Sequence, residues 1–250
     1  MRPVMAAMAR WDRATERRVH RYLAISQYVA RRIGLYYNRR SRIVYPPVET
    51  NFYTPPPTAA EAGGHALSEL QRVEGSERQQ LEGFLVVSAL VPYKRVDLAI
   101  RAAKRAGVPL TIVGDGPERA RLEAMAGEQV RFRGWSQNEE IRDLYRSTIA
   151  TILPGEEDFG IVPLESQACG RPVVALGVGG ARETVLDGET GVLVEPGDEA
   201  LADGLRRAAS ATWDSERIRR HAERFSRERF VREICDVIDD TMSAPPAHRW

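Results

Sequence analysis

Two carboxylates spaced eight positions apart are the groups in this chain whose type and spacing best suit chemistry. Glu157 lies in the polar stretch GEEDFG, and Glu165 lies in the stretch PLESQACG that follows it. A buried strand is predicted just before them by the apolar run IATILP, which makes GEEDFG the loop at that strand's carboxyl end. Pro163 suits the first turn of a helix, because its missing N–H costs nothing there. We therefore expect both carboxylates to face one cleft.

The start of this helix is also expected to bind an anion. Gly160 lets a ligand approach the backbone closely, and the amides of Ile161 and Val162 point outward from the helix start. Two carboxylates beside such a site repel a phosphate unless they contact hydroxyl groups, which donate strong hydrogen bonds to them. Sugar or ribose hydroxyls fit this pattern. For Glu165 the competing interpretation, that it only complements the helix dipole, is equally favoured.

The stretch from Glu156 to Val174 resembles the signature of a large family of retaining glycosyltransferases with the GT-B fold, the "glycosyl transferases group 1" family. In that signature two glutamates eight positions apart flank a Phe-Gly turn. The resemblance implies that Glu157 is a catalytic residue that contacts the transferred sugar, and that Glu165 binds the ribose. It also implies donor contacts from Phe159, Gly160, Ile161 and Val162. The matching positions are Glu157, Phe159, Gly160, Glu165, Ala168, Gly170, Pro172 and Val173.

A lysine upstream resembles the family's diphosphate contact. The stretch SALVPYKRVDLAI, residues 88–100, matches the element that carries this lysine, which would be Lys94 and catalytic. A lysine beside a helix start suits phosphate as a point charge, although for this residue in isolation a solvated helix lysine is the simpler interpretation. Many family members carry an arginine shortly before it. Here Ala89 holds that position, so one contact is either missing or supplied by a neighbour such as Arg95.

Three glycine-containing stretches continue the resemblance in the family's order. VGDGP, with Gly114, resembles a strand-to-helix turn in which glycine permits a tight bend. RFRGW resembles the strand end that borders the nucleobase and makes Arg133, Gly134 and Trp135 donor-binding candidates, although packing explains Trp135 equally well. GVGGARE, residues 177–183, resembles the glycine loop near the sugar-phosphate. As an analogy only, the whole match favours a subgroup rich in mannosyl-type transferases.

Strand and helix patterns from Gly83 onward predict the scaffold that positions these groups. Short apolar runs alternate with helical patterns, which indicates βαβ units and the α/β class with a Rossmann-like, doubly wound parallel sheet. Right-handed crossovers then place the carboxyl ends of the strands along one edge, where ligands bind in such folds. The predicted strands are FLVVSAL, PLTIVG, QVRFRG, IATILP, RPVVAL and GVLVEP.

We predict four segments along the chain. Residues 1–55 resemble only a remnant of a GT-B N-terminal (acceptor) domain, and residues 56–82, rich in Pro, Gly, Ala, Ser and Glu, form a linker. Residues 83–225 form the nucleotide-sugar-binding Rossmann-like domain, and residues 226–250 a C-terminal helix and tail. Within the first segment, helical spacing over Arg10 to Arg32 is interrupted at LAIS.

Composition excludes several classes of function. The chain has 43% hydrophobic and 28% charged residues and a formal charge of +1, which is ordinary for a soluble globular protein and does not favour nucleic acid. It has no apolar run of about 18 residues, so no membrane-spanning helix is expected. The lack of a signal-peptide pattern favours the cytoplasm. The basic, amphipathic start leaves peripheral contact with the inner face of the membrane as a minor alternative.

Cysteines and histidines receive no catalytic role. Cys169 and Cys235 match no metal-ligand or disulfide spacing, and each is expected to be a small buried residue. The histidines are expected to be surface residues. They are His20, His65, His221 and His248.

Together these features predict a glycosyltransferase that moves a hexose, with mannose as one candidate, from a nucleoside-diphosphate sugar to a hydroxyl acceptor with retention of configuration. The donor would be GDP-mannose or a UDP-sugar. No cofactor or metal is required, because Lys94 and helix-start amides would stabilise the leaving diphosphate. The acceptor, a glycan or a lipid-linked molecule, is not specified.

Two other functions are alternatives to independent sugar transfer. The first is a nucleotide-sugar-binding fragment, or half of a split enzyme that needs a separate N-terminal chain or self-association. The second is a GT-B epimerase, which the glutamate spacing opposes.

Overall fold

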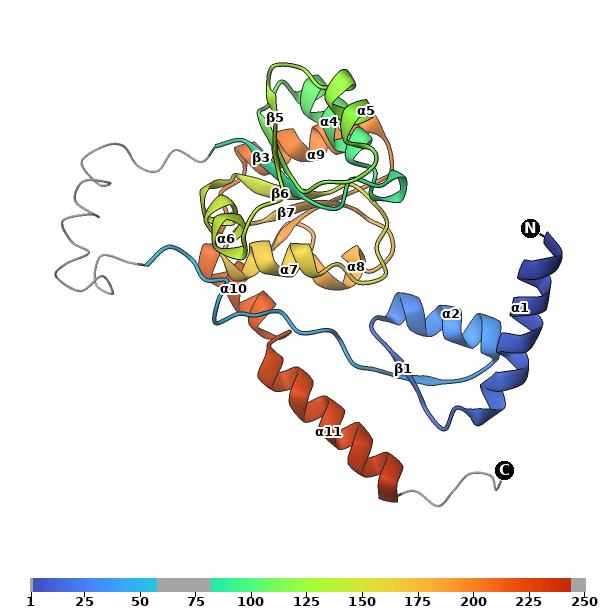
Figure 1. Ribbon diagram of the computed structural model, residues 1–250. Coiled ribbons are helices and arrows are strands. Elements are labelled where there is room, and N and C mark those ends of the chain that lie inside the picture. Colours follow the sequence, from blue (N-terminus) through green and yellow to red (C-terminus); the bar gives the residue numbers. More distant parts are fainter. Residues whose placement is uncertain (1, 58–81, 244–250) are drawn as a thin grey trace.

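Two parallel sheets of different size organise the chain in the computed structural model, which describes residues 2–57 and 82–243 (Figure 1). The larger sheet has the strand order β5-β4-β3-β6-β7-β8, and every pairing in it is parallel. This order confirms the predicted doubly wound sheet. Its strands are β3 (Phe84–Val87), β4 (Leu110–Val113), β5 (Val130–Gly134), β6 (Ala150–Leu153), β7 (Val173–Leu176) and β8 (Gly191–Val194).

The strand order reverses between β3 and β6. The larger sheet begins with β3, adds β4 and β5 on one side, and then continues with β6 on the other side of β3. At such a switch point the connections leave toward opposite faces, so a crevice opens at the carboxyl ends of the two central strands. The loops that follow β3 and β6 therefore border one cleft.

Helices cover both faces of this sheet (Figure 1). Within β3, Phe84 and Val86 join the hydrophobic cluster of one face, whereas Leu85 joins the cluster of the other, because neighbouring side chains of a strand point to opposite sides. Apolar packing on both faces explains why the strands have continuous apolar sequences. One face carries α4 (Val96–Ala106), α5 (Arg119–Met125) and α9 (Asp198–Ser210). The other carries α6 (Asn138–Ser147), α7 (Ile161–Ala168), α8 (Ala181–Thr184) and α10 (Ser215–Glu223).

The front of the chain forms a much smaller parallel unit. Strands β1 (Tyr22–Ala24) and β2 (Ser41–Ile43) pair with each other, and helix α2 (Gln27–Tyr37) connects them. The Ser26 hydroxyl caps α2 by accepting the Val29 amide at 3.0 Å. The LAIS interruption predicted in the helical spacing thus contains a strand and a helix cap. Helix α1 (Arg2–Thr15) and a short 3-10 helix, η1 (Glu16–Arg18), precede this unit.

A crossover segment, residues 44–57, and helix α11 (Arg227–Ser243) connect the small unit with the larger domain. The Val48 amide donates to the Phe225 carbonyl at 2.8 Å where the crossover passes the end of α10. Arg42 of β2 pairs with Asp240 of α11 at 3.0 Å. None of the described helices has the length and apolar content needed to span a bilayer.

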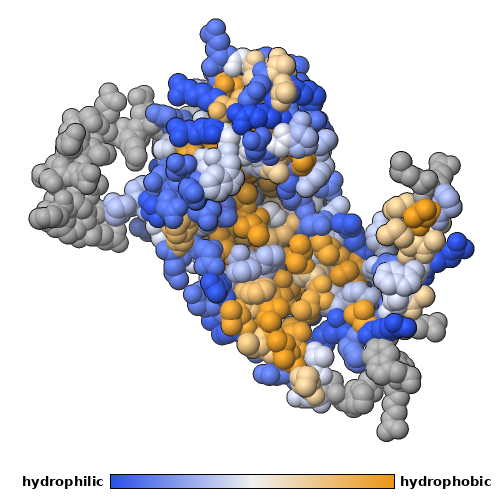
Figure 2. Space-filling view, in the orientation of Figure 1, coloured by the Kyte–Doolittle hydropathy of each residue, from blue (hydrophilic) through white to orange (hydrophobic). Residues whose placement is uncertain are grey.

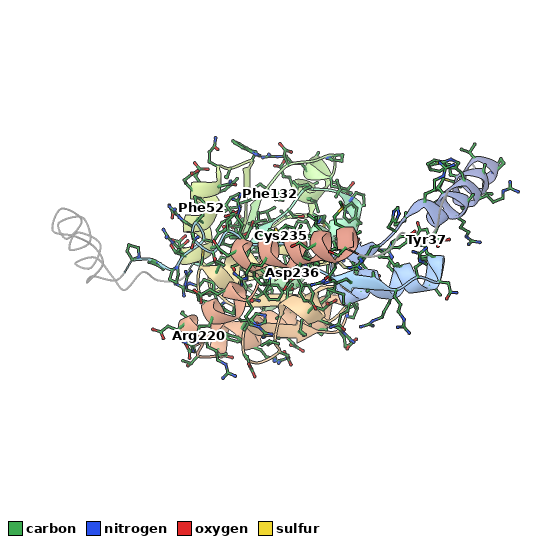
Figure 3. The ribbon with its side chains drawn as sticks, turned by 90° about the horizontal axis from the view of Figure 1, so that it is seen from below. Tyr37, Phe52, Phe132, Arg220, Cys235 and Asp236 are labelled. Atoms are coloured by element: carbon green, nitrogen blue, oxygen red, sulfur yellow. The ribbon has the colours of Figure 1, made fainter. Side chains whose placement is uncertain are left out.

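Two expectations about single residues are wrong. Cys169 is buried as predicted, but Cys235 is exposed on α11 (Figure 3). His221 is only 7% exposed, because α10 packs against α7 and its imidazole lies against the Phe225 ring at a centroid distance of 5.6 Å. His65 and His248, like residues 58–81 of the predicted linker, lie outside the described residues.

Gly114 at the end of β4 offers a test of how tightly the cleft strands are packed. Its φ is +126°, and a Cβ atom built on it would lie 1.9 Å from the Ser88 carbonyl oxygen. We expect Gly114→Ala to lower the free energy of unfolding by at least about 2 kcal/mol, since strain and overlap add. Urea unfolding monitored by circular dichroism would measure this loss.

Gly107, after α4, is the matched control. Its φ is +69°, but a Cβ atom there meets nothing within 4 Å. Gly107→Ala should therefore cost only the left-handed backbone penalty of about 1–2 kcal/mol. Equal losses for the two variants would contradict the close packing of β4 against the loop after β3.

Candidate active site

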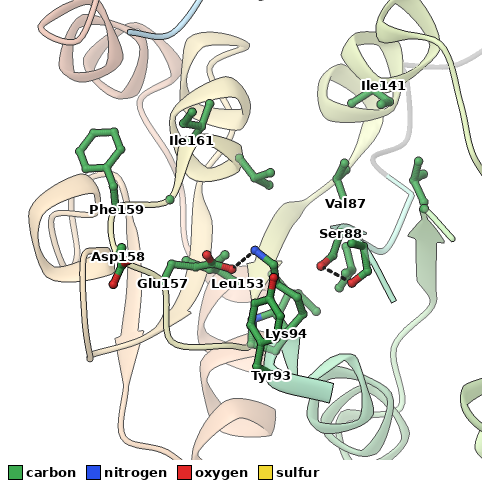
Figure 4. Close-up of a pocket in the computed structure, with 18 of the residues that line it drawn as sticks. Val87, Ser88, Tyr93, Lys94, Ile141, Leu153, Glu157, Asp158, Phe159 and Ile161 are labelled. Carbon is green, nitrogen blue, oxygen red and sulfur yellow. Dashed lines mark hydrogen bonds and ion pairs between the residues drawn. The ribbon is translucent and has the colours of Figure 1, made fainter. Parts of the chain in front are cut away.

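A cleft of about 860 Å³ opens at the carboxyl ends of β3 and β6 (Figure 4). Its walls come from the loops after β3, β4, β5 and β6 and from the first turns of α6 and α7. Ile25 of the small unit and Pro46, in the segment after β2, also line it. Most predicted site residues are among those that line it. They are Lys94, Gly114, Trp135, Glu157, Phe159, Gly160, Ile161 and Val162.

Glycines shape the loop between β6 and α7, residues 154–160. Gly155 lies so close to the β3 loop that a Cβ atom would be 2.9 Å from the carbonyl oxygens of Tyr93 and Lys94. Gly160 precedes α7 with a φ of +92°, a backbone conformation that residues other than glycine rarely adopt. Ile161 and Val162, at the start of α7, line the cleft, and the anion site expected there stays a prediction.

The glycine loop after β7 supports this loop from behind. The Gly180 amide donates to the Glu157 carbonyl at 2.7 Å. A Cβ atom on Gly180 would lie 2.3 Å from the Phe159 Cα atom, and one on Gly179 would lie 2.4 Å from the Glu157 carbonyl oxygen. Gly179 and Gly180 therefore fix the backbone of Glu157 and Phe159, and neither glycine lines the 860 Å³ cleft.

Lys94 and Glu157 form an ion pair inside the cleft (Figure 4). The Lys94 Nζ atom lies 2.5 Å from the Glu157 Oε1 atom, and the two side chains are 25% and 18% exposed. Lys94 ends the 3-10 helix η2 (Pro92–Lys94) after β3, and Glu157 follows β6, so the switch point brings them together. The sequence assigned both residues to one site but did not predict that they would neutralise each other.

Glu165 lies on α7 outside the residues that line the cleft. Its Oε2 atom accepts a hydrogen bond from the hydroxyl of Tyr145 on α6 at 2.8 Å. Burial raises the pKa of the Glu165 carboxyl above its usual value, while hydrogen bonds from Tyr145 and Tyr53 lower it. Neither tyrosine was singled out from the sequence. The contact between Glu165 and a ribose stays a prediction.

The remaining predicted residues differ in whether their side chains are open to a ligand. Trp135 follows β5 at the edge of the cleft and is 72% exposed, which argues against the packing interpretation. Phe159 is buried and stacks on Tyr45 at 5.6 Å, so its ring serves packing. Gly134 holds β4 and β5 together by accepting the Gly114 amide at 2.7 Å. Gly134 and Arg133 are not among the residues that line the cleft.

Arg95 does not replace the missing arginine in this structure. It adopts a left-handed conformation with φ of +53°, and its guanidinium pairs with Asp97 at 3.2 Å. The Arg95 side chain borders a smaller neighbouring cavity and not the 860 Å³ cleft. A diphosphate contact from Arg95 would require this pair to open.

Sequence reasoning missed several polar residues of the cleft. Each follows a strand end or begins the next helix, and this position is the signal that could have found them. Their hydroxyl, carboxylate and amide groups can bind polar parts of a ligand. They are Ser88, Asp115, Ser136 and Asn138.

Helix α2 of the small unit docks on the loop between β6 and α7. Arg32 pairs with Asp158 at 2.8 Å. The Glu183 carboxylate of α8 accepts the Gln27 and Tyr28 amides at 2.8 and 3.1 Å, where a negative charge stabilises the start of a helix. These contacts connect the small unit to the residues around Glu157.

The fold and the cleft define an α/β domain suited to a ligand that carries both phosphate and hydroxyl groups. The profile of the family described as "Glycosyl transferases group 1" matches residues 68–225. The chain belongs to this family, as the sequence signature predicted.

Curated relatives share about a third of their residues with this chain. The D-inositol 3-phosphate glycosyltransferase of Acidothermus cellulolyticus is 34% identical over 231 residues, which cover 82% of this chain and 49% of the relative. The protein of the same name from Geodermatophilus obscurus is 34% identical over 218 residues, or 77% of this chain and 46% of the relative. The chain thus spans about half the length of these relatives.

Solved structures share its fold. Anabaena Alr3699/HepE in complex with UDP and glucose has a TM-score of 0.72 at 22% identity, over 90% of this chain and 64% of that chain. Sucrose-phosphate synthase from Thermosynechococcus elongatus has a TM-score of 0.71 at 23% identity, over 89% and 58%. The predicted Rossmann-like domain of a GT-B fold is confirmed.

Because Lys94 and Glu157 form an ion pair, the variant Glu157→Gln is expected to gain affinity for nucleotide. Removing this negative charge frees the Lys94 ammonium and removes repulsion against a diphosphate in the same cleft. We expect the variant to bind UDP or GDP more tightly, by roughly 1 kcal/mol or about fivefold. Isothermal titration calorimetry at low ionic strength would measure the change.

Asp158→Asn is the control for this variant, because Asp158 is also an acid of the cleft but pairs with Arg32. Asp158→Asn should change the affinity for UDP or GDP less than Glu157→Gln does. Weaker nucleotide binding by Glu157→Gln would show that Lys94 does not act on the diphosphate.

Proposed function

We propose that this domain binds the donor in a retaining glycosyltransferase, which transfers a hexose from a nucleoside-diphosphate sugar to a hydroxyl acceptor. The observation that carries the proposal is the meeting of Lys94 and Glu157 at 2.5 Å in a cleft that also contains the start of α7. One group suits a diphosphate and the other suits sugar hydroxyls. The helix start adds backbone donors for the phosphate oxygens.

The proposed chemistry is electrostatic. As the bond between the sugar and the diphosphate breaks, negative charge grows on the leaving oxygen, and Lys94 and the amides of Ile161 and Val162 stabilise it. These fixed positive groups take the role that a divalent cation has in other transferases, so no metal is required in this proposal. Glu157 accepts hydrogen bonds from the sugar and orients it toward the incoming hydroxyl group.

The names of similar proteins suggest which donors and acceptors to test. HepE structures are described with UDP and with UDP-glucose, which makes a UDP-sugar the first donor to test and GDP-mannose the second. The curated relatives carry the name D-inositol 3-phosphate glycosyltransferase, so an inositol phosphate joins a glycan or lipid-linked acceptor as a candidate.

Trp135 is proposed to stack on the nucleobase. An indole that is 72% exposed at the edge of a cleft offers a flat apolar face to a ligand. Stacking of a base on an aromatic side chain contributes roughly 1–3 kcal/mol and tolerates different bases. Trp135 would therefore favour nucleotides in general and would not choose between uracil and guanine.

Nucleotide binding tests the proposal directly. UDP or GDP should bind to the purified chain, and Lys94→Ala and Trp135→Ala should each weaken binding by roughly 1–3 kcal/mol. Calorimetry would measure the affinity, and because the chain has four tryptophans, the part of the fluorescence quenching that is lost in Trp135→Ala would report Trp135.

Lys104→Ala is the matched control for Lys94→Ala, because Lys104 lies on α4 outside the cleft and donates to the Met125 carbonyl at 2.7 Å. It should leave the affinity unchanged. Absence of measurable binding at millimolar nucleotide would refute the proposed function.

A second candidate is a donor-binding half that needs further polypeptide for turnover. Two-stranded sheets are marginal alone, and parallel sheets are normally covered on both faces. The small unit has only β1 and β2, and α1 exposes Val4, Met5, Met8 and Trp11. Figure 2 shows further apolar side chains over the region of α11, where Val231, Ile238 and Met242 are exposed. A separate chain or self-association would cover such surfaces. Sugar transfer by the purified monomeric chain would refute this candidate.

A further inference from the structure

A buried tyrosine holds the Glu165 carboxylate between two helices. The Tyr145 hydroxyl of α6 donates to the Glu165 Oε2 atom of α7 at 2.8 Å, and Tyr145 is completely buried. A hydrogen bond from a neutral phenol to a carboxylate is charge-assisted and fixes the direction of both groups. The Glu165 side chain is thus held in one orientation.

A second tyrosine reaches the same carboxylate from the crossover segment. Tyr53 is buried, and its ring meets the Tyr145 ring edge-on at a centroid distance of 5.8 Å. A side-chain hydrogen bond from the Tyr53 phenol also lowers the pKa of the Glu165 carboxyl, against the effect of burial. Two phenols from distant parts of the sequence therefore converge on Glu165.

Two arginines fix the crossover segment where it carries Tyr53. Arg219 of α10 donates to the carbonyls of Tyr53 and of Ala168, the last residue of α7, at 3.2 and 2.8 Å. Arg146 of α6 donates to the Thr54 carbonyl and hydroxyl, both at 2.8 Å. The backbone of the crossover is therefore attached to the two helices that carry Tyr145 and Glu165 and to α10.

The pair of Tyr145 and Glu165 lies one helical turn behind the wall of the cleft. Ile141 precedes Tyr145 by four positions on α6, Val162 precedes Glu165 by three on α7, and both line the cleft. Helical side chains lean toward the amino end of their helix, which for both helices is the end at the cleft. Glu165 accordingly lies one helical turn deeper along α7 than the cleft residue Val162.

The carboxylate keeps capacity for a ligand. An ionised carboxylate offers about four acceptor positions, and two phenols leave roughly half of them open. Burial raises the pKa of the Glu165 carboxyl, which favours the neutral form, and the hydrogen bonds from the two phenols act against this shift. Without the phenols the group would be a poorer acceptor for hydroxyl donors.

We propose that Tyr145 and Tyr53 are positioning residues, which hold the Glu165 carboxylate so that it accepts hydrogen bonds from the ribose hydroxyls of the donor. This inference rests on the proposed function, because it assumes that a nucleotide occupies the cleft. It assigns ribose recognition to three residues from α6, α7 and the crossover. The crossover segment thereby becomes part of the donor site.

Preference for ribose over deoxyribose gives the test. We expect the unchanged protein to bind UDP more tightly than its 2′,3′-dideoxy analogue by about 10- to 100-fold, as for charge-assisted hydrogen bonds. Tyr145→Phe and Tyr53→Phe remove one oxygen each and keep the packed rings. Both variants should lower the ratio of the UDP affinity to the dideoxy-analogue affinity at least about threefold, while the affinity for the dideoxy analogue itself stays the same. GDP and its dideoxy analogue replace UDP where GDP is the nucleotide that binds.

Matched variants separate positioning from general stability. Tyr37→Phe removes a hydroxyl that donates to Asp12 at 2.6 Å, outside the residues that line the cleft, and should leave the ratio unchanged. Glu165→Gln should lower the ratio as the tyrosine variants do. Thermal melts check folding, and Tyr53→Phe provides the readout where Tyr145→Phe does not fold.

The possible outcomes are distinguishable. A ratio that falls in Glu165→Gln but persists in both tyrosine variants overturns the positioning role alone. Equal weakening of UDP and its dideoxy analogue shows a structural role only and also overturns it. Failure of the unchanged protein to bind any of these nucleotides overturns the proposed function, and the inference falls with it.

Discussion

The reversal of strand order between β3 and β6 is the constraint on which the rest of the site depends. Parallel strands present their carboxyl ends at one edge, and the reversal leaves the loops after β3 and β6 facing each other with no helix between them. Lys94 and Glu157, 63 positions apart, meet at 2.5 Å for this reason. A lysine and a carboxylate in contact satisfy each other in the free protein, so the cleft carries its charges without an unpaired ion. A diphosphate sugar would offer each of them a replacement partner of the right kind.

Close backbone packing turns this topology into a defined loop shape. Gly155 lets the loop between β6 and α7 pass against Tyr93 and Lys94, and Gly179 and Gly180 let the β7 loop support it from the other side. The loop is thus held from both sides by backbone atoms, which move less than side chains. This arrangement gives Glu157 a fixed direction even though it lies in a connection and not in a helix or strand. A site built this way is preorganised, which lowers the cost of aligning a ligand.

The sequence predicted the doubly wound parallel sheet, the helices between its strands and eight of the residues that line the cleft, because these follow from local patterns and from one long signature. It could not predict contacts that depend on how distant segments pack. The ion pair of Lys94 with Glu157 joins two loops, and the tyrosines around Glu165 come from α6 and from the crossover. Nor could it predict that Asp97 pairs with the Arg95 guanidinium; the donor contact expected of Arg95 stays a prediction.

Three consecutive acids, Glu156, Glu157 and Asp158, show how the small unit and the donor loop depend on each other. Glu157 pairs with Lys94 and Asp158 pairs with Arg32, while a side-chain hydrogen bond to Glu156 raises the pKa of the Tyr28 phenol. Tyr28 and Arg32 both lie on α2, whose first amides are held by Glu183 of α8. The small unit therefore helps to set the shape of the loop that carries Glu157. Any polypeptide that covers or moves β1, β2 and α2 would act on Glu157 through these contacts, which gives the small unit a direct physical route to the chemistry of the cleft.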